Sequence, residues 1–254
     1  MAAAPHEGQV AIVTGAASGI GFAVARRLAE GGSAVAVVDQ NGAGAEIAAS
    51  SLRALGVSAI ACQANVAESA EVRSVVEAVV ANLGEPSILV NNAGISRGGR
   101  VQDISEEDWD LVLSVNLRGS FLFCKFVVPL MVEARYGRIV SIASGTAVRV
   151  GPGTSPYAAS KAGVIALTKS VAGEVARMGI TANVVAPGIT DTAMTRGQFG
   201  DRLEEEAASG RIANPMKVVI QPDDIASAVC YLALPESRYI TGQTIHVNAG
   251  AFMP

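Results

Sequence analysis

The chain has few of the residues that many metal sites and hydrolytic sites require. Its 254 residues include two histidines, His6 and His246, and three cysteines without a Cys-x-x-Cys spacing. A histidine-based metal site or a Ser-His-Asp triad therefore lacks its residues, and we predict no metal. Cys62, Cys124 and Cys230 stand in apolar stretches, which predicts buried, reduced thiols in a reducing compartment. We expect His6 in a frayed N-terminal tail and His246 in a structural role.

The net charge is small, and long apolar runs are few. Lys and Arg number 19 against 23 Asp and Glu, a net charge of −4 without a basic stretch, which excludes a nucleic-acid scaffold. The longest apolar run, Phe121–Val132, contains Lys125 and is shorter than the roughly 18 residues of a membrane span. The first residues lack the pattern of a targeting peptide. Since half of the residues are apolar, we predict a soluble cytoplasmic protein with a large core and no membrane partner.

Short β-rich runs alternate with helix-length segments along the chain. The strand candidates, rich in Val and Ile, are Val10–Val13, Ala34–Val38, Ala59–Ala61, Ile88–Val90, Arg138–Ser141, Thr181–Val185 and Thr244–Val247. The helix candidates are Gly19–Glu30, Ala43–Ala54, Ala70–Asn82, Glu106–Ala134, Pro156–Met178 and Asp223–Leu234. Such alternation implies parallel strands joined by crossover helices. Because no Pro- or Ser-rich linker interrupts it, we predict an α/β fold with one doubly wound domain over residues 1–254.

One polar segment, residues 190–221, departs from this alternation. It contains Gly197, Gly200, Gly210 and Pro215 and the charged run Asp201–Glu206. Loops of this length are uncommon in compact folds and often carry function. We therefore predict a substrate-binding lid; the alternative is a solvated excursion with a short helix.

A glycine-rich turn follows the first strand and opens the first helix. Within Thr14–Gly21, glycine recurs as Gly-x-x-x-Gly-x-Gly. Glycine permits a tight turn and lets a ligand approach the backbone, and the start of a helix attracts a pyrophosphate. The turn therefore predicts a dinucleotide site formed by Gly15, Ser18, Gly19, Ile20 and Gly21.

Asp39 ends the second strand and bears on the choice of dinucleotide. A carboxylate at this place can accept hydrogen bonds from both hydroxyls of the adenosine ribose. It would repel a 2′-phosphate, and neither the glycine turn nor Gln40 and Asn41 supplies an Arg or Lys to offset the repulsion. We therefore predict NAD as the cofactor in preference to NADP.

Tyr157, Lys161 and Ser144 form a candidate proton-transfer group. Tyr157 and Lys161 are four residues apart, so on a helix they lie on one face. A phenol has a pKa near 10, and a nearby ammonium lowers it by stabilising the phenolate. Ser144 follows a predicted strand, where its hydroxyl can hydrogen-bond a carbonyl or alcohol oxygen beside the phenol. This group predicts acid–base chemistry on such an oxygen.

With these motifs the chain resembles the short-chain dehydrogenases/reductases along nearly its whole length. The matching segments are Thr14–Gly21, Asn91–Gly94, Asn116, Ser144, Tyr157-x-x-x-Lys161 and Pro187–Gly188. The resemblance implies a Rossmann-type sheet of seven mainly parallel strands with helices on both faces. It also implies a homotetramer built on the helices Glu106–Ala134 and Pro156–Met178.

The resemblance further implies a role for each matching residue. Tyr157 would be the general acid/base, Ser144 would orient the substrate oxygen, and Lys161 would lower the pKa of Tyr157 and bind the nicotinamide ribose. Asn116 would hold a water that links Lys161 to solvent. Asn65 replaces a common Asp of the family and keeps an acceptor oxygen without the charge. The remaining cofactor-binding residues implied are Asn65, Val66, Asn92, Ala93, Gly94, Pro187, Gly188, Thr190 and Thr192.

The expected function is NAD-dependent hydride transfer between a secondary alcohol and its ketone, with a small-molecule substrate. The expected substrate pocket is a mixed polar and apolar wall of Ser96, Thr146, Val148, Thr154, Met194 and Phe199. The alternative is a 3-oxoacyl-[acyl-carrier-protein] reductase, which the chain resembles in length and layout. Those enzymes usually use NADPH, which Asp39 opposes, and often carry Arg where this chain has Gly173, although Arg135 is retained. A non-catalytic NAD(H)-binding regulator is a remote alternative, because the catalytic set is complete.

Overall fold

The structure, a computed structural model, describes residues 4–209 and 214–253. Seven strands form one sheet in the order β3-β2-β1-β4-β5-β6-β7, and every neighbouring pair is parallel. Each predicted strand lies within an observed one, so the predicted Rossmann-type α/β fold is confirmed. The strands are β1 (Val10–Thr14), β2 (Ala34–Asp39), β3 (Ala59–Gln63), β4 (Ile88–Asn91), β5 (Gly137–Ile142), β6 (Ile180–Pro187) and β7 (Thr244–Val247).

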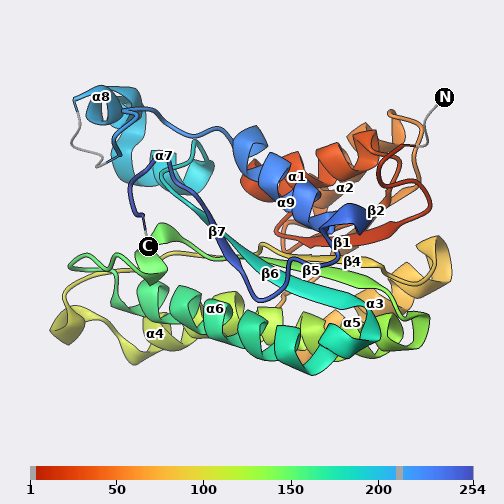
Figure 1. Cartoon of the computed structure of the whole chain (residues 1–254). Coiled ribbons are helices and arrows are strands. Elements are labelled where there is room, and N and C mark those ends of the chain that lie inside the picture. The colour runs from red at the N-terminus through yellow and green to blue at the C-terminus, as the bar shows by residue number, and fades with distance from the viewer. Residues whose placement is uncertain (1–3, 210–213, 254) are drawn as a thin grey trace.

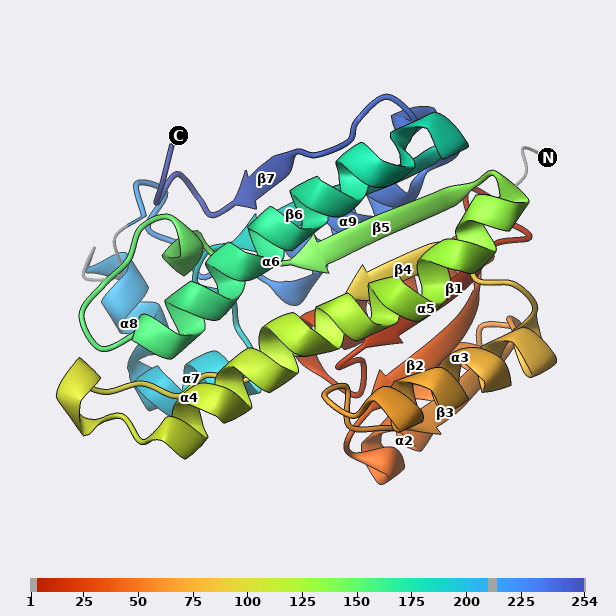
Figure 2. The ribbon, with the colours of Figure 1, turned by 90° about the horizontal axis from the view of Figure 1, so that it is seen from below.

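Helices cover both faces of the sheet (Figure 1). In β1, Ala11 and Val13 belong to the core on one face and Ile12 to the core on the other, because successive strand side chains point in opposite directions. One face carries α1 (Gly19–Glu30), α2 (Gly42–Arg53) and α9 (Pro222–Ala233). The other face carries α3 (Ser69–Leu83), α5 (Gly119–Ala134) and α6 (Ser155–Val175), which Figure 2 shows from below.

The predicted helix Glu106–Ala134 is one continuous rod with an irregular centre. It consists of α4 (Glu106–Leu113), a π-helical turn η2 (Ser114–Arg118) and α5. In the described ranges it is the one helix long and apolar enough to cross a membrane, with a mean hydropathy of 1.6 over 18 residues. The sequence prediction concerned uncharged apolar runs, and this rod is not one, because it contains Arg118 and Lys125. Leu122, Phe123 and Val127 on its inner face are packed in the core beneath the sheet, as in the core helix of a globular protein.

The predicted lid is partly helical. After β6 the chain forms α7 (Ala193–Phe199), the short η5 (Gly200–Arg202) and α8 (Leu203–Ala208). Leu203 and Ala207 are buried against Ile189, Phe199 and Val219, which gives this segment a small core of its own. Figure 1 shows it projecting beyond the sheet at the end where β6 terminates. Residues 210–213 of the predicted lid lie outside the described residues.

Two expectations for the histidines have different outcomes. His6 is buried, with a 3% exposed fraction, and its backbone N–H donates to Gly31 O at 2.8 Å, so the expectation of a frayed tail at this residue is wrong. His246 lies on β7 with its ring edge-on to Phe252, a packing contact in line with a structural role. All three cysteines are free and buried, as predicted.

Candidate active site

A cavity of about 320 Å³ lies where the carboxyl ends of the strands meet the glycine-rich turn and α7. It gathers nearly all of the predicted site residues from widely separated parts of the sequence. They are Gly15, Ser18, Gly19, Ile20, Asp39, Asn65, Val66, Asn92, Ala93, Gly94, Ser144, Tyr157, Lys161, Pro187, Gly188, Thr190 and Thr192. Gly21 and Asn116 do not line the cavity but support residues that do. Open α/β sheets bind ligands at this edge.

The glycine-rich turn has the shape that its sequence predicts. Gly15 and Gly19 have positive φ angles of 62° and 56°, which other residues rarely adopt. A Cβ on Gly21 would lie 2.2 Å from Gly15 O, so only glycine fits the close approach of helix and turn. Ser18 caps α1 without a side-chain hydrogen bond, leaving the first N–H groups of the helix to another acceptor. These features fit a dinucleotide pyrophosphate.

Asn92 and Thr14 tie the turn to the end of β4. The Asn92 side-chain amide donates to Thr14 O at 2.8 Å and to Gly15 O at 3.0 Å. In return, the Thr14 hydroxyl oxygen accepts from the backbone N–H groups of Asn92, at 2.9 Å, and Ala93, at 3.0 Å. The two strand ends therefore support the turn as one unit.

Asp39 lines the cavity, and its carboxylate also accepts two backbone hydrogen bonds. Ala17 N donates to Oδ2 at 3.0 Å and Asn41 N donates to Oδ1 at 2.9 Å. The lining of the cavity contains one lysine, Lys161, and no arginine among the described residues. The end of the cavity at Asp39 therefore presents a negative charge held in place by two backbone N–H groups, without an arginine or lysine beside it among the lining residues.

Tyr157 and Ser144 meet in the cavity. Tyr157 comes from the first turns of α6, and Ser144 precedes the short helix η3 (Gly145–Ala147) that follows β5. The two side chains are hydrogen-bonded, and Ser144 Oγ also accepts from Thr146 N at 3.1 Å. Burial raises the pKa of the Tyr157 phenol, and the hydrogen bond to Ser144 only partly offsets this. The phenol is therefore protonated at neutral pH.

Lys161 is buried one helical turn from Tyr157. Its Nζ donates to Ile142 O at 2.8 Å and lies 5.9 Å from the centre of the Tyr157 ring. Burial lowers the pKa of the Lys161 ammonium to about 8. The causes of the raised Tyr157 pKa are burial and, opposing it, the Ser144 hydrogen bond, so the lowering of this pKa by Lys161 that the resemblance implies stays a prediction.

Asn116 lies in the π-helical turn, fully buried behind the cavity. Its Oδ1 accepts from Ile95 N at 2.8 Å, and its Nδ2 donates to Ile95 O at 3.0 Å and to Ser160 Oγ at 2.9 Å. The Ser120 hydroxyl donates to Asn116 O at 2.9 Å, across the wider turn. Asn116 thus connects Ile95, in the loop that follows β4, to Ser160 on α6, next to Lys161.

Comparison with known proteins decides the family. A family model described as enoyl-(acyl carrier protein) reductase matches residues 15–251. The chain is 43% identical over 247 residues to the 3-oxoacyl-[acyl-carrier-protein] reductase FabG of Staphylococcus aureus (strain N315), covering 96% of this chain and 98% of the relative. It is 41% identical over 250 residues to the FabG of Escherichia coli (strain K12), covering 97% and 98%. The chain belongs to the short-chain dehydrogenase/reductase family.

This short-chain dehydrogenase/reductase also has cavity residues that the sequence did not reveal. They are Gln40, Ala64, Ile95, Val115, Ile142, Ala143, Ala193 and Thr195. Met194, which was expected at the substrate pocket, also lines the cavity. Most adjoin a motif residue, which is the one signal that could have indicated them. The other five expected pocket residues, among them Val148 and Phe199, are not in the lining. In the described residues no cluster of three His, Cys, Asp or Glu side chains could hold a metal ion.

Proposed function

We propose that the chain is an NADH-dependent reductase that converts a 3-oxoacyl thioester into the 3-hydroxyacyl thioester. Two relatives that cover almost the whole chain carry the name of that reaction. They favour the 3-oxoacyl reductase, our alternative from the sequence, over a general secondary-alcohol dehydrogenase. The coarser conclusion, an oxidoreductase of the short-chain family, does not depend on this choice.

The observation that carries the proposal is the protonated Tyr157 phenol hydrogen-bonded to Ser144 within the dinucleotide cavity. Reduction of a carbonyl needs a proton donor at the oxygen, whereas oxidation of an alcohol needs a base. Because burial raises the pKa of Tyr157, the chain's own residues favour the donor state. The hydroxyl is therefore in place to donate its proton to a carbonyl oxygen when the enzyme runs in the direction of reduction.

The catalytic roles follow from these positions. The nicotinamide, when bound, supplies the hydride. The Ser144 hydroxyl orients the 3-oxo oxygen, and the Tyr157 phenol donates its proton to that oxygen. Lys161 and Asn116 lie behind Tyr157, where they supply and relay the proton that restores the phenol. Glycines 15, 19 and 21 with Asn92 hold the pyrophosphate end, and Thr190 and Thr192 hold the nicotinamide end.

We further propose NADH as the cofactor, although the resemblance associates 3-oxoacyl reductases with NADPH. Asp39 supports this choice, because it lines the cavity and its position is held by two backbone N–H groups. A carboxylate that cannot move away repels a 2′-phosphate strongly in a partly buried site.

The deciding experiment measures kcat/KM for an acetoacetyl thioester with NADH and with NADPH, beside a panel of secondary alcohols with NAD. We expect the thioester with NADH to be the best pair. A higher kcat/KM for a secondary alcohol would restore the general dehydrogenase. NADH binding without turnover of any substrate would support a regulator.

Three further features belong to this proposal. Residues 190–221 form the substrate-binding lid of a single domain that spans the chain.

We propose a homotetramer built on α5 and α6, whose outer surface has a groove lined by Phe121, Val128, Pro129 and Leu167. Light scattering coupled to size exclusion tests this assembly, and a monomeric mass would contradict it. The buried free thiols are typical of a cytoplasmic enzyme.

A further inference from the structure

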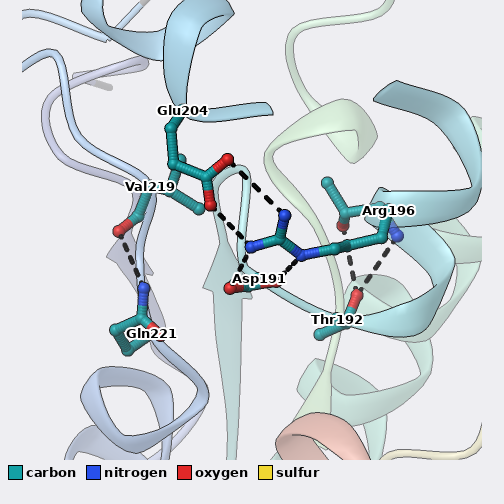
Figure 3. A network of polar contacts seen from close by, with 7 residues as sticks. Asp191, Thr192, Arg196, Glu204, Val219 and Gln221 are labelled. Atoms are coloured by element: carbon teal, nitrogen blue, oxygen red, sulfur yellow. Dashed lines mark hydrogen bonds and ion pairs between the residues drawn. The ribbon is translucent and has the colours of Figure 1, made fainter. Parts of the chain in front are cut away.

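A cluster of three charged side chains joins the segments of the lid (Figure 3). Arg196 on α7 binds Asp191 through two parallel hydrogen bonds, Nε to Oδ1 and Nη2 to Oδ2, each 2.7 Å long. The same Nη2 donates to Glu204 Oε1 on α8 at 2.6 Å, and Nη1 lies 3.5 Å from Glu204 Oε2. The Arg196 guanidinium holds the pKa of both carboxyls below their usual values, so the cluster is ionised at neutral pH.

The cluster adjoins the cavity without lining it. Between Asp191 and Arg196, the side chains of Thr192 and Thr195 line the cavity, whereas Asp191, Arg196 and Glu204 do not. Thr192 Oγ1 accepts from Thr195 N at 3.3 Å and so fixes the first turn of α7. Thr192 Cγ2 lies 3.5 Å from the point where a Cβ on Gly19 would be, directly against the phosphate-binding turn.

The base of the lid is anchored independently of Arg196. Asp191 N donates to Ile220 O at 2.9 Å, and Ile220 N donates to Ile189 O at 3.1 Å. At the same base, Gln221 Nε2 donates to Val219 O at 3.5 Å (Figure 3). Asp191 therefore lies where the two ends of the lid pair with each other, and Arg196 connects both α7 and α8 to it.

We propose that Arg196 is a positioning residue for the dinucleotide: by binding Asp191 and Glu204 together, it holds Thr192 against the phosphate-binding turn. Cofactor affinity then depends on a side chain that does not touch the cofactor. The inference rests on the dinucleotide site of the proposed function and not on the identity of the carbonyl substrate.

The test measures the Kd of NADH by nucleotide fluorescence in Arg196→Met, which keeps the length of the side chain and removes the charge. Ion pairs at partly exposed sites are weak singly, so for the paired cluster we expect Kd to rise about three- to tenfold. Arg196→Lys, which can bind one carboxylate but lacks the planar fork, should give an intermediate Kd. Arg202→Met is the matched control, because Arg202 lies in the same lid and its contact with Glu206 is 3.9 Å long.

A double-mutant cycle tests whether Arg196 acts through Glu204. We expect Arg196→Met to raise Kd less in a Glu204→Gln background than in the wild-type chain. Chymotrypsin cleavage after Phe199 gives a readout without activity: NADH should protect this bond in the wild type and less so in Arg196→Met. With saturating NADH, kcat should stay within about twofold of the wild type while KM for NADH rises.

Two results would overturn the proposal. One is an Arg196→Met variant with the wild-type Kd, and the other is an equal rise in Arg202→Met. If Arg196→Met does not fold, Arg196→Lys and Glu204→Gln carry the same test, and wild-type Kd values in both reject it. A wild-type chain that binds neither NADH nor NADPH would reject the dinucleotide site as well, which separates the two failures.

Discussion

Gly21→Ala should disrupt cofactor binding because the added methyl group has no room. The new Cβ would lie 2.2 Å from Gly15 O and 2.5 Å from Asn92 Nδ2. Nonbonded carbon and oxygen atoms approach to about 3.2 Å, so the turn would have to retreat by about 1 Å. That movement displaces the backbone that is to receive the pyrophosphate.

The expected loss of stability follows from the contacts that the methyl group breaks. Asn92 Nδ2 would lose its hydrogen bonds to Thr14 O and Gly15 O, each worth about 1 kcal/mol. Overpacking adds about 1–3 kcal/mol. We expect the free energy of unfolding to fall by about 3–5 kcal/mol when the two costs are added. The Kd of NADH should rise at least about tenfold.

Urea unfolding and NADH fluorescence titration measure the two effects. Gly173→Ala is the control, because Gly173 lies inside α6 and a Cβ there meets no atom within 4 Å. That change should raise the free energy of unfolding by up to about 1 kcal/mol and leave the Kd unchanged. A Gly21→Ala chain that binds NADH as tightly as the wild type would refute the argument from close approach.

Three further predictions concern the cofactor and the catalytic group. Asp39→Ser should shift the ratio of kcat/KM values toward NADPH by about tenfold or more, because it removes the charge facing a 2′-phosphate; an unchanged ratio would contradict this. Tyr157→Phe should lower kcat by about 10²–10⁴ with NADH binding intact, and retained turnover would exclude Tyr157 as the proton donor. Lys161→Met should raise the free energy of unfolding at pH 7 by about 2–3 kcal/mol, because the folded state holds a buried ammonium whose pKa is lowered from 10.5 to about 8. As the pH rises from about 8 to 10.5, the unfolded wild type binds more protons than the folded one, so the wild type gains stability and the difference shrinks; a pH-independent difference would count against the lowered pKa.

The strands and most helices could be predicted because each depends on a local pattern. A buried parallel strand needs a short run of apolar residues, and the pattern found all seven strands to within two residues at either end. Helix α1 begins and ends at the predicted residues, Gly19 and Glu30, because the glycine turn and Gly31 bound it. Such signals need no knowledge of distant contacts.

The motif residues of the candidate site could be predicted, but their electrostatics could not. Sequence spacing places Lys161 beside Tyr157, yet the pKa values depend on how deeply α6 buries both side chains. The interruption of the long helix at Asn116 depends on contacts with Ile95 and Ser160, which are distant in sequence.

Loop residues were the least predictable. Val148, in a loop, and Phe199, at the end of α7, were expected at the substrate pocket, but the direction of such a side chain depends on which segment packs beneath it. Phe199 instead packs against Leu203 in the small core of the lid. Arg196 drew no attention in the sequence, because its carboxylate partners belong to different segments of the lid.

The π-helical turn at Ser114–Arg118 has a consequence for how this rod tolerates change. A π turn holds one more residue than an α-helical turn, and each residue of a regular helix rotates the chain by about 100°. Deleting Val115 would restore regular α-helical hydrogen bonding through this turn and would rotate α4 about the helix axis relative to α5. The side chains of α4 and α5 would then face different directions, so this single surplus amino acid sets the angular alignment between the two ends of the rod.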